Sequence, residues 1–219
     1  MTGITLISDG EGPAVSLSDT DILLERCIVS GGSAGVKLTG TLNNPTLKHC
    51  RILENRGHGV HACEGAQGVF TECEIYNNTK SGVLVRDSNS CPRFERCQIR
   101  DNNNAGVDLG GQGRVLLVEC DIFNNTLNGV TAQGERTHPR FERCKIRDNK
   151  QAGVCIFGSA SGDFLKCDIY SNVRSGVRVT GIAVMIHGVV SPYESESCRH
   201  VADFAYASPA AKLLDDRLP

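Results

Sequence analysis

The sequence that decides the fold is PRFERCQIRDNNNAGV (residues 92–107), which returns almost unchanged as PRFERCKIRDNKQAGV (residues 139–154). The two segments start 47 residues apart, and a more divergent segment with the same spacing, LVECDIFNNTLNGV (residues 117–130), lies between them. Self-similarity at a fixed period indicates a repeat architecture, and the near copies indicate duplication of a two-repeat unit.

Cysteine makes the repeat easiest to count. Seven of the eleven cysteines recur every 23 or 24 residues, at Cys27, Cys50, Cys73, Cys97, Cys120, Cys144 and Cys167. An apolar residue stands three before and two after each of them, and a Gly-Val pair follows further on. In six repeats the residue five after the cysteine is asparagine: Asn55, Asn78, Asn102, Asn125, Asn149 and Asn172.

Each repeat therefore reads Φ-x-x-C-x-I-x-x-N, a short polar link, and G-V-x-Φ, where Φ is apolar. Apolar residues spaced two apart are typical of strands with one buried face. About 23 residues with three short strands are one coil of a parallel β-helix, in which successive coils lie roughly 4.8 Å apart. The sequence thus predicts an all-β solenoid, a single-stranded parallel β-helix of about 7–8 coils spanning residues 1–190.

A leucine-rich repeat is the alternative, because L-x-x-L-x-L-x-x-N has the same spacing. That repeat needs another apolar residue two after the asparagine. Only Leu127 satisfies this requirement, whereas Gly57, Lys80, Asn104, Gln151 and Arg174 do not. The β-helix is therefore favoured.

The two ends of the chain depart from the repeat. Residues 4–20 read as a degenerate first coil. Near the other end, Ser191, Pro192 and Glu194 have the order of a helix N-cap, a first-turn proline and a capping-box glutamate. We therefore expect residues 191–219 to form a C-terminal helical cap.

The repeated columns predict distinct interior roles. Stacked cysteines would have Cβ atoms about 4.8 Å apart, whereas a disulfide needs about 3.8 Å, so we expect reduced, buried thiols. The asparagines should satisfy backbone groups at a corner of the coil. The glycine before each valine should allow either a close approach or a positive φ.

Composition bounds the function. The chain has 219 residues, and 40% of them are hydrophobic, which excludes a wholly disordered protein. The formal net charge of −2 gives no excess of positive charge that would attract nucleic acid or an anionic membrane. We expect no cofactor and no metal. Reduced cysteines favour a cytoplasmic, reducing environment.

Outward-facing positions should carry the function. The residue three after the cysteine alternates between aromatic and guanidinium side chains, and we identify these residues as the candidate partner-binding site: Tyr76, Arg100, Phe123, Arg147 and Tyr170. At strand spacing they are near enough for cation–π contacts. Both a self-stabilising solvated surface and a protein-docking surface fit this pattern.

A second cluster, His58, His61 and Cys63, has an H-x-x-H-x-C order. It is either a metal site or an ordinary polar edge.

Many β-helices act on acidic polysaccharides, so a carbohydrate-active enzyme (a polysaccharide lyase, epimerase or glycosidase) or a carbohydrate-binding β-helix is the alternative function. Outward positions of the strand before each cysteine bring no three carboxylates together, and the chain has no Trp for stacking on sugars. We therefore predict no catalytic residues and favour a non-enzymatic scaffold.

The paired coils resemble the right-handed β-helix repeats (CASH, or PbH1-type) of F-box-only proteins. The resemblance rests on Asn44-Pro45, Cys91-Pro92 and His138-Pro139 before one class of coil, and on residues 119–130 in the other. It implies a right-handed β-helix and a protein partner, with substrate recognition as in F-box-type ubiquitin ligase adaptors as the expected role. Cysteine stands here where those proteins place asparagine.

Overall fold

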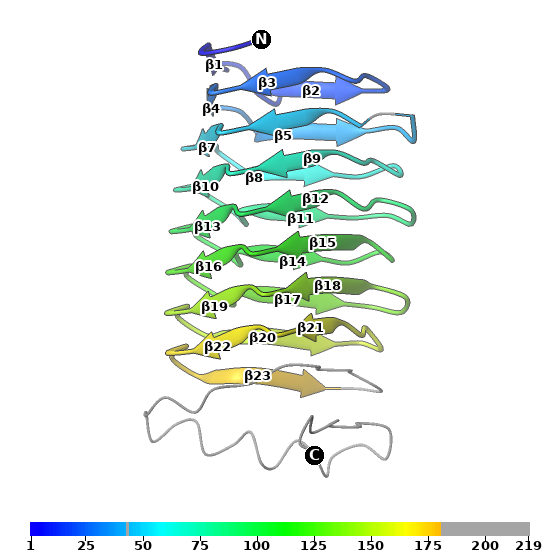
Figure 1. The fold of residues 1–219 in the computed structure, drawn as a ribbon, viewed down its shortest axis with the longest axis vertical. Coiled ribbons are helices and arrows are strands. Elements are labelled where there is room, and N and C mark those ends of the chain that lie inside the picture. Colours follow the sequence, from blue (N-terminus) through cyan, green and yellow to red (C-terminus); the bar gives the residue numbers. More distant parts are fainter. Residues whose placement is uncertain (43, 181–219) are drawn as a thin grey trace, which may run out of the picture.

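The computed structural model describes residues 1–42 and 44–180, which form a rod of stacked coils with every strand running parallel to its neighbours (Figure 1). Three parallel sheets run along the rod, as the 23- or 24-residue period predicts. The β-helix prediction is confirmed, and the predicted first coil over residues 4–20 contains two of the strands. The predicted cap at 191–219 lies outside the described residues.

Each coil contributes one strand to each sheet, except that the last described coil contributes none to sheet 3. Sheet 1 has eight strands: β1 (Thr5–Ile7), β4 (Ile28–Ser30), β7 (Arg51–Leu53), β10 (Glu74–Tyr76), β13 (Gln98–Arg100), β16 (Asp121–Phe123), β19 (Lys145–Arg147) and β22 (Asp168–Tyr170). Sheet 2 also has eight: β2 (Val15–Ser18), β5 (Ala34–Thr39), β8 (His58–Ala62), β11 (Val83–Val85), β14 (Val107–Leu109), β17 (Val130–Gln133), β20 (Ala152–Phe157) and β23 (Ser175–Thr180).

Sheet 3 has seven strands: β3 (Leu23–Glu25), β6 (Thr46–Lys48), β9 (Val69–Thr71), β12 (Arg93–Glu95), β15 (Arg114–Val118), β18 (His138–Glu142) and β21 (Asp163–Leu165). The described residues include no helix, so they include none that could cross a membrane.

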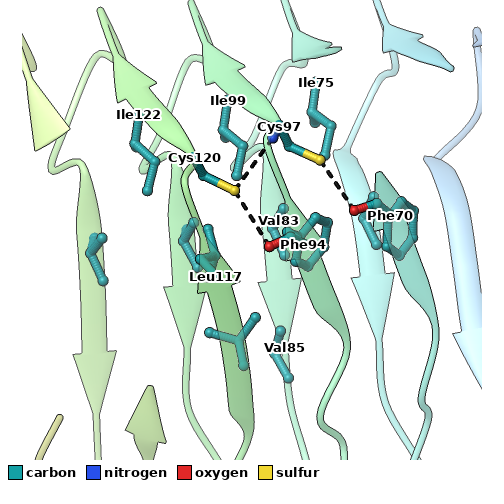
Figure 2. Packing of buried hydrophobic residues seen from close by; sticks show 14 of the residues in the cluster. Phe70, Ile75, Val83, Val85, Phe94, Cys97, Ile99, Leu117, Cys120 and Ile122 are labelled. Carbon is teal, nitrogen blue, oxygen red and sulfur yellow. Dashed lines mark hydrogen bonds between the residues drawn. The ribbon is translucent and has the colours of Figure 1, made fainter. Parts of the chain in front are cut away.

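The core is a set of columns in which like stacks on like. Ile75 pairs with Ile99 and Phe70 with Phe94, because the strand register preserves the sequence period. All four side chains are fully buried, and Figure 2 shows them pointing into the rod between the sheets. The Phe70 and Phe94 rings stack with centroids 4.6 Å apart, a geometry that adds to the burial energy of each ring.

The corner between sheets 3 and 1 turns on one residue in the left-handed region, such as Arg96 with φ 51°, followed by the repeat cysteine. The buried Cys97 thiol donates to the Phe70 carbonyl and accepts from the Cys73 N–H, both at 3.4 Å. All ten cysteines in the described part of the chain are free thiols. The expected reduced column is therefore present, and its sulfur atoms also satisfy backbone groups at the corner.

The corner between sheets 1 and 2 holds the asparagine column. Asn102 Nδ2 donates to the Ile75 carbonyl at 3.2 Å and to Asn125 Oδ1 at 3.0 Å. Asn102 Oδ1 in turn accepts from the backbone N–H and the side-chain amide of Asn78, at 3.1 and 2.9 Å. Each amide thus joins its neighbouring coils and satisfies buried backbone groups, as the sequence predicts.

The repeat glycines serve close approach and not positive φ. A Cβ on Gly106 would lie 2.5 Å from Ile122 Cγ2 and 2.8 Å from Asn125 Nδ2, with no left-handed φ at that position. Of the two roles expected from the sequence, the structure shows the first: the absence of a Cβ leaves space for the isoleucine and asparagine side chains of the next coil.

Asn102→Ala should lower the free energy of unfolding by about 3–5 kcal/mol, because it removes several buried hydrogen bonds and strands the Ile75 carbonyl and the Asn78 N–H. Urea denaturation followed by circular dichroism measures the loss. Asn103→Ala is the matched control, since Asn103 is exposed in the same turn, and it should change stability by less than about 0.5 kcal/mol. Equal losses for the two variants would contradict the bridging role of the buried amide.

Candidate functional site

The five predicted partner-binding residues form one continuous column on the outer surface of sheet 1. The strand register places Tyr76 beside Arg100, Arg100 beside Phe123, Phe123 beside Arg147, and Arg147 beside Tyr170. All five side chains are partly exposed. The structure therefore brings the predicted residues together, because each projects from the last position of its strand in successive coils.

Each guanidinium lies over the aromatic ring of the preceding coil. The Arg100 Cζ is 4.2 Å from the centre of the Tyr76 ring, and the Arg147 Cζ is 4.2 Å from the centre of the Phe123 ring. These are cation–π distances.

Both guanidinium groups are also held by carboxylates. Arg100 contacts Glu74 of the preceding coil at 2.9 Å and Asp101 of its own coil at 2.8 Å. Arg147 makes the same arrangement 47 residues later, with Asp121 and Asp148 at 2.8 Å each.

The contact with Asp121 is bidentate, because Arg147 Nε also donates to it at 3.2 Å. Hydrogen bonds to Asp121 raise the pKa of Arg147 above its ordinary value. Bidentate pairing fixes the planar group more firmly than one bond does.

We define the aromatic–arginine face as the outward residues of β10, β13, β16, β19 and β22 with Asp101 and Asp148. It carries three cations, Arg100, Lys145 and Arg147, and five carboxylates, Glu74, Asp101, Asp121, Asp148 and Asp168. Because the arginines are neutralised within the face, its remaining charge is negative. The Glu74, Asp101 and Asp148 side chains are 41%, 35% and 39% exposed, so the carboxylates line the surface around the rings.

A second set of ion pairs runs along the corner between sheets 3 and 1. Arg96 contacts Glu72 at 3.0 Å, and Arg143 contacts Glu119 at 3.0 Å in the equivalent coil 47 residues later. These side chains are 42–51% exposed, and within residues 1–42 and 44–180 no aromatic ring stacks on their arginines. This corner is therefore a natural comparison for tests of the aromatic–arginine face.

The H-x-x-H-x-C cluster does not converge as a three-ligand site. The His58 and His61 rings are 6.0 Å apart, whereas Cys63 is buried and its thiol donates to the Leu38 carbonyl at 3.8 Å. Among residues 1–42 and 44–180, no group of three or more His, Cys, Asp or Glu side chains is placed to hold a metal ion.

His58 nevertheless lies in an unusual environment on sheet 2. Burial, and then the nearby charges of His61, Lys80 and Arg86, lower the pKa of His58 from its ordinary value of 6.5 to about 4. Its Nδ1 atom and the Ser81 hydroxyl are buried with no hydrogen-bond partner among the described residues.

Contacts of Arg86 and of His138 were missed by the sequence reasoning. Arg86 contacts Asp108 at 3.4 Å on sheet 2, and burial raises the pKa of that carboxyl. On sheet 3, His138 contacts both Ser161 and Asp163. The coil period places the partners of all three contacts in adjacent coils, since each pair is separated by 22 to 25 residues.

The sequence matches the family model of the right-handed β-helix region over residues 5–139 and 92–187. The chain therefore belongs to the right-handed β-helix family, and its coils are right-handed as expected. A comparison with curated proteins gave no match.

Two solved structures share the fold. The pectate lyase Pel9A has a TM-score of 0.68 and 13% identity, with 87% of this chain and 61% of that one covered. The A-module of the Azotobacter vinelandii mannuronan C-5 epimerase AlgE4 has a TM-score of 0.62 and 15% identity, with 89% and 58% covered. The chain thus spans about three fifths of each structure, and identities this low show the fold alone.

The depressed pKa of His58 predicts a pH effect on stability. The unfolded chain binds a proton at this side chain near pH 6.5 and the folded chain only near pH 4, so stability is lost as the pH falls between these values. His58→Gln should reduce that loss by about 1–2 kcal/mol, allowing for partial solvent screening. Urea titrations at pH 7 and pH 4.5 measure it.

His49→Gln is the control, because His49 is on the surface with its side chain 45% exposed. It tests the histidine-to-glutamine exchange itself, and its free energy of unfolding at pH 7 should change by less than about 0.5 kcal/mol. Identical pH dependence in all three proteins would contradict the assignment to His58.

Proposed function

We propose that this protein is a rigid β-helical scaffold whose aromatic–arginine face docks another protein. The observation that carries the proposal is the preformed stack of Arg147, held between the Phe123 ring and the carboxylates of Asp121 and Asp148. Aromatic and arginine side chains are enriched among residues that dominate binding energy. Side chains fixed before binding lose little rotamer entropy when a partner arrives.

The charge of the face specifies the partner's chemistry. Its arginines are already neutralised, so the groups left to attract a partner are the surrounding carboxylates and the exposed parts of the rings. A complementary partner presents apolar or aromatic side chains to Tyr76, Phe123 and Tyr170, with Lys or Arg around them facing Asp101 and Asp148. A regular sheet is suited to such docking, because its outward columns keep constant spacing.

The narrower role, recognition of substrates in a ubiquitin ligase adaptor, rests on the sequence resemblance to F-box-only proteins and stays a prediction. A cytoplasmic location is likewise proposed, and the ten free thiols of the described residues support a reducing environment.

The test neutralises two carboxylates of the face with Asp101→Asn and Asp148→Asn. Asparagine tolerates the left-handed backbone of both positions (φ 54°), and Glu74 and Asp121 still hold the arginines. Proteins captured from a lysate of the source cells, quantified by mass spectrometry at low salt, should fall about tenfold relative to wild type.

Glu72→Gln with Glu119→Gln is the matched control. These residues also lie 47 apart, adopt φ values of 54° and 55°, and pair with arginines, but they lie on the other corner. This variant should capture the same proteins as wild type. Equal capture by all three proteins, or none above the bare matrix, would count against docking at this face.

A carbohydrate-active enzyme is the second candidate, favoured by the fold shared with a pectate lyase and a mannuronan C-5 epimerase. It predicts that incubation with pectate or polymannuronate and Ca²⁺ yields unsaturated uronates or epimerised residues, detected by ultraviolet absorbance and NMR. Unchanged polymer in both reactions would remove this candidate.

A further inference from the structure

A hydrogen-bonded chain of three side chains lies on the outer surface of sheet 3, on a different sheet from the aromatic–arginine face. Ser161 Oγ is 2.7 Å from His138 Nδ1, and Asp163 Oδ2 is 3.2 Å from His138 Nε2. His138 begins β18, whereas Ser161 and Asp163 come from the next coil, just before and at the start of β21. The two coils hold these residues together through the strand register.

The Asp163 carboxylate fixes the state of the imidazole. A carboxylate only accepts hydrogen bonds, so His138 Nε2 carries the hydrogen and Nδ1 presents its lone pair to the Ser161 hydroxyl. Arg140 Nη1, 3.9 Å from the same Asp163 oxygen, places a cation beside the carboxylate. The order is nucleophile, base and orienting acid, which is the order that activates serine hydroxyls in catalytic triads, here with the two ring nitrogens exchanged.

A comparable histidine lies one residue past β6 of the same sheet, on the corner between sheets 3 and 1, and lacks this arrangement. His49 contacts Glu72 through Nδ1 at 3.2 Å, but within the described residues no hydroxyl bonds to its ring. The contrast separates an ordinary cross-strand ion pair from the chain at His138, where both ring nitrogens are bonded and one partner is a hydroxyl.

A cation without an ion-pair partner among the described residues lies beside the hydrogen-bonded Ser161, His138 and Asp163 side chains. Arg114 is the register partner of His138 in β15, its side chain is exposed, and it enters no ion pair in the described part of the protein. An anionic group on a substrate would find a partner there. The Asp163 side chain is 19% exposed and that of His138 is 38% exposed, so the base is accessible while the acid is largely covered.

We propose that Ser161 is a nucleophile and that this cluster hydrolyses esters. The ester joins a small carboxylic acid to a hydroxyl group of an anionic substrate. Ser161 Oγ attacks the ester carbonyl carbon as its proton passes to His138 Nδ1, and the protonated imidazole is stabilised by Asp163. The carbon–oxygen bond to the alcohol then breaks, and the alcohol leaves with the proton from Nδ1. Water, deprotonated by the same nitrogen, cleaves the acyl-serine, which releases the acid and restores the hydroxyl.

The test uses a fluorophosphonate probe on the full-length protein, followed by mass spectrometry of the Ser161 peptide and by release of nitrophenol from p-nitrophenyl acetate. Wild type should acquire one adduct at Ser161. Ser161→Ala should lose both signals, and His138→Ala should lower the labelling rate roughly 100-fold. Asp163→Asn should slow labelling while leaving the thermal midpoint close to that of wild type.

His49→Ala is the control, because it removes a histidine–carboxylate pair that lies on the corner beside sheet 3 and has no serine partner among the described residues; it should label at the wild-type rate. No adduct on folded wild-type protein, an adduct at another residue, or unchanged labelling in His138→Ala would each overturn the proposal. Nitrophenol release that persists in Ser161→Ala would also overturn it, since the nucleophile would then be another group.

Discussion

The rod depends on the buried amide at the corner between sheets 1 and 2. Asn125 Oδ1 accepts from the backbone and side chain of Asn102, while its own Nδ2 donates to the Ile99 carbonyl and to Asn149. Each amide therefore bonds to the coils on both sides. Because these bonds allow one register only, they align every outward column, including the aromatic–arginine face.

At the corner between sheets 3 and 1, cysteine thiols also bond to backbone groups, but more weakly than the asparagine amides do. Cys120 Sγ accepts from the Cys97 N–H at 3.4 Å and donates to the Phe94 carbonyl at 3.5 Å (Figure 2). Burial raises the pKa of Cys97 well above its ordinary value, which keeps that thiol neutral. Sulfur bonds less strongly than an amide oxygen does, so the thiol column contributes packing first and polarity second.

The sequence was sufficient for the columns, the register and the grouping of the five face residues, because a strict period leaves one way to stack the coils. It was not sufficient to decide which adjacent side chains form ion pairs, or which of two possible roles a repeat glycine has. Nothing in the repeat says that Arg147 pairs with Asp121 of the preceding coil, or that Gly106 serves close approach and not positive φ. The contacts of His138 span one coil, but Ser161 lies in a loop whose sequence does not repeat, so the period alone did not single out its hydroxyl.

The alternating side chains constrain how such a rod can change its length. Removing a single coil between β13 and β19 would set Arg100 beside Arg147 and Arg96 beside Arg143, so that like charges would face each other about one strand spacing apart. Removing two coils, those of β13 and β16, would instead set Tyr76 beside Arg147 and Glu72 beside Arg143, so that a ring–arginine pair and an opposite-charge pair would face each other again. An even change in the number of coils can therefore keep the alternation between aromatic and arginine residues over β10 to β22, whereas an odd change breaks it.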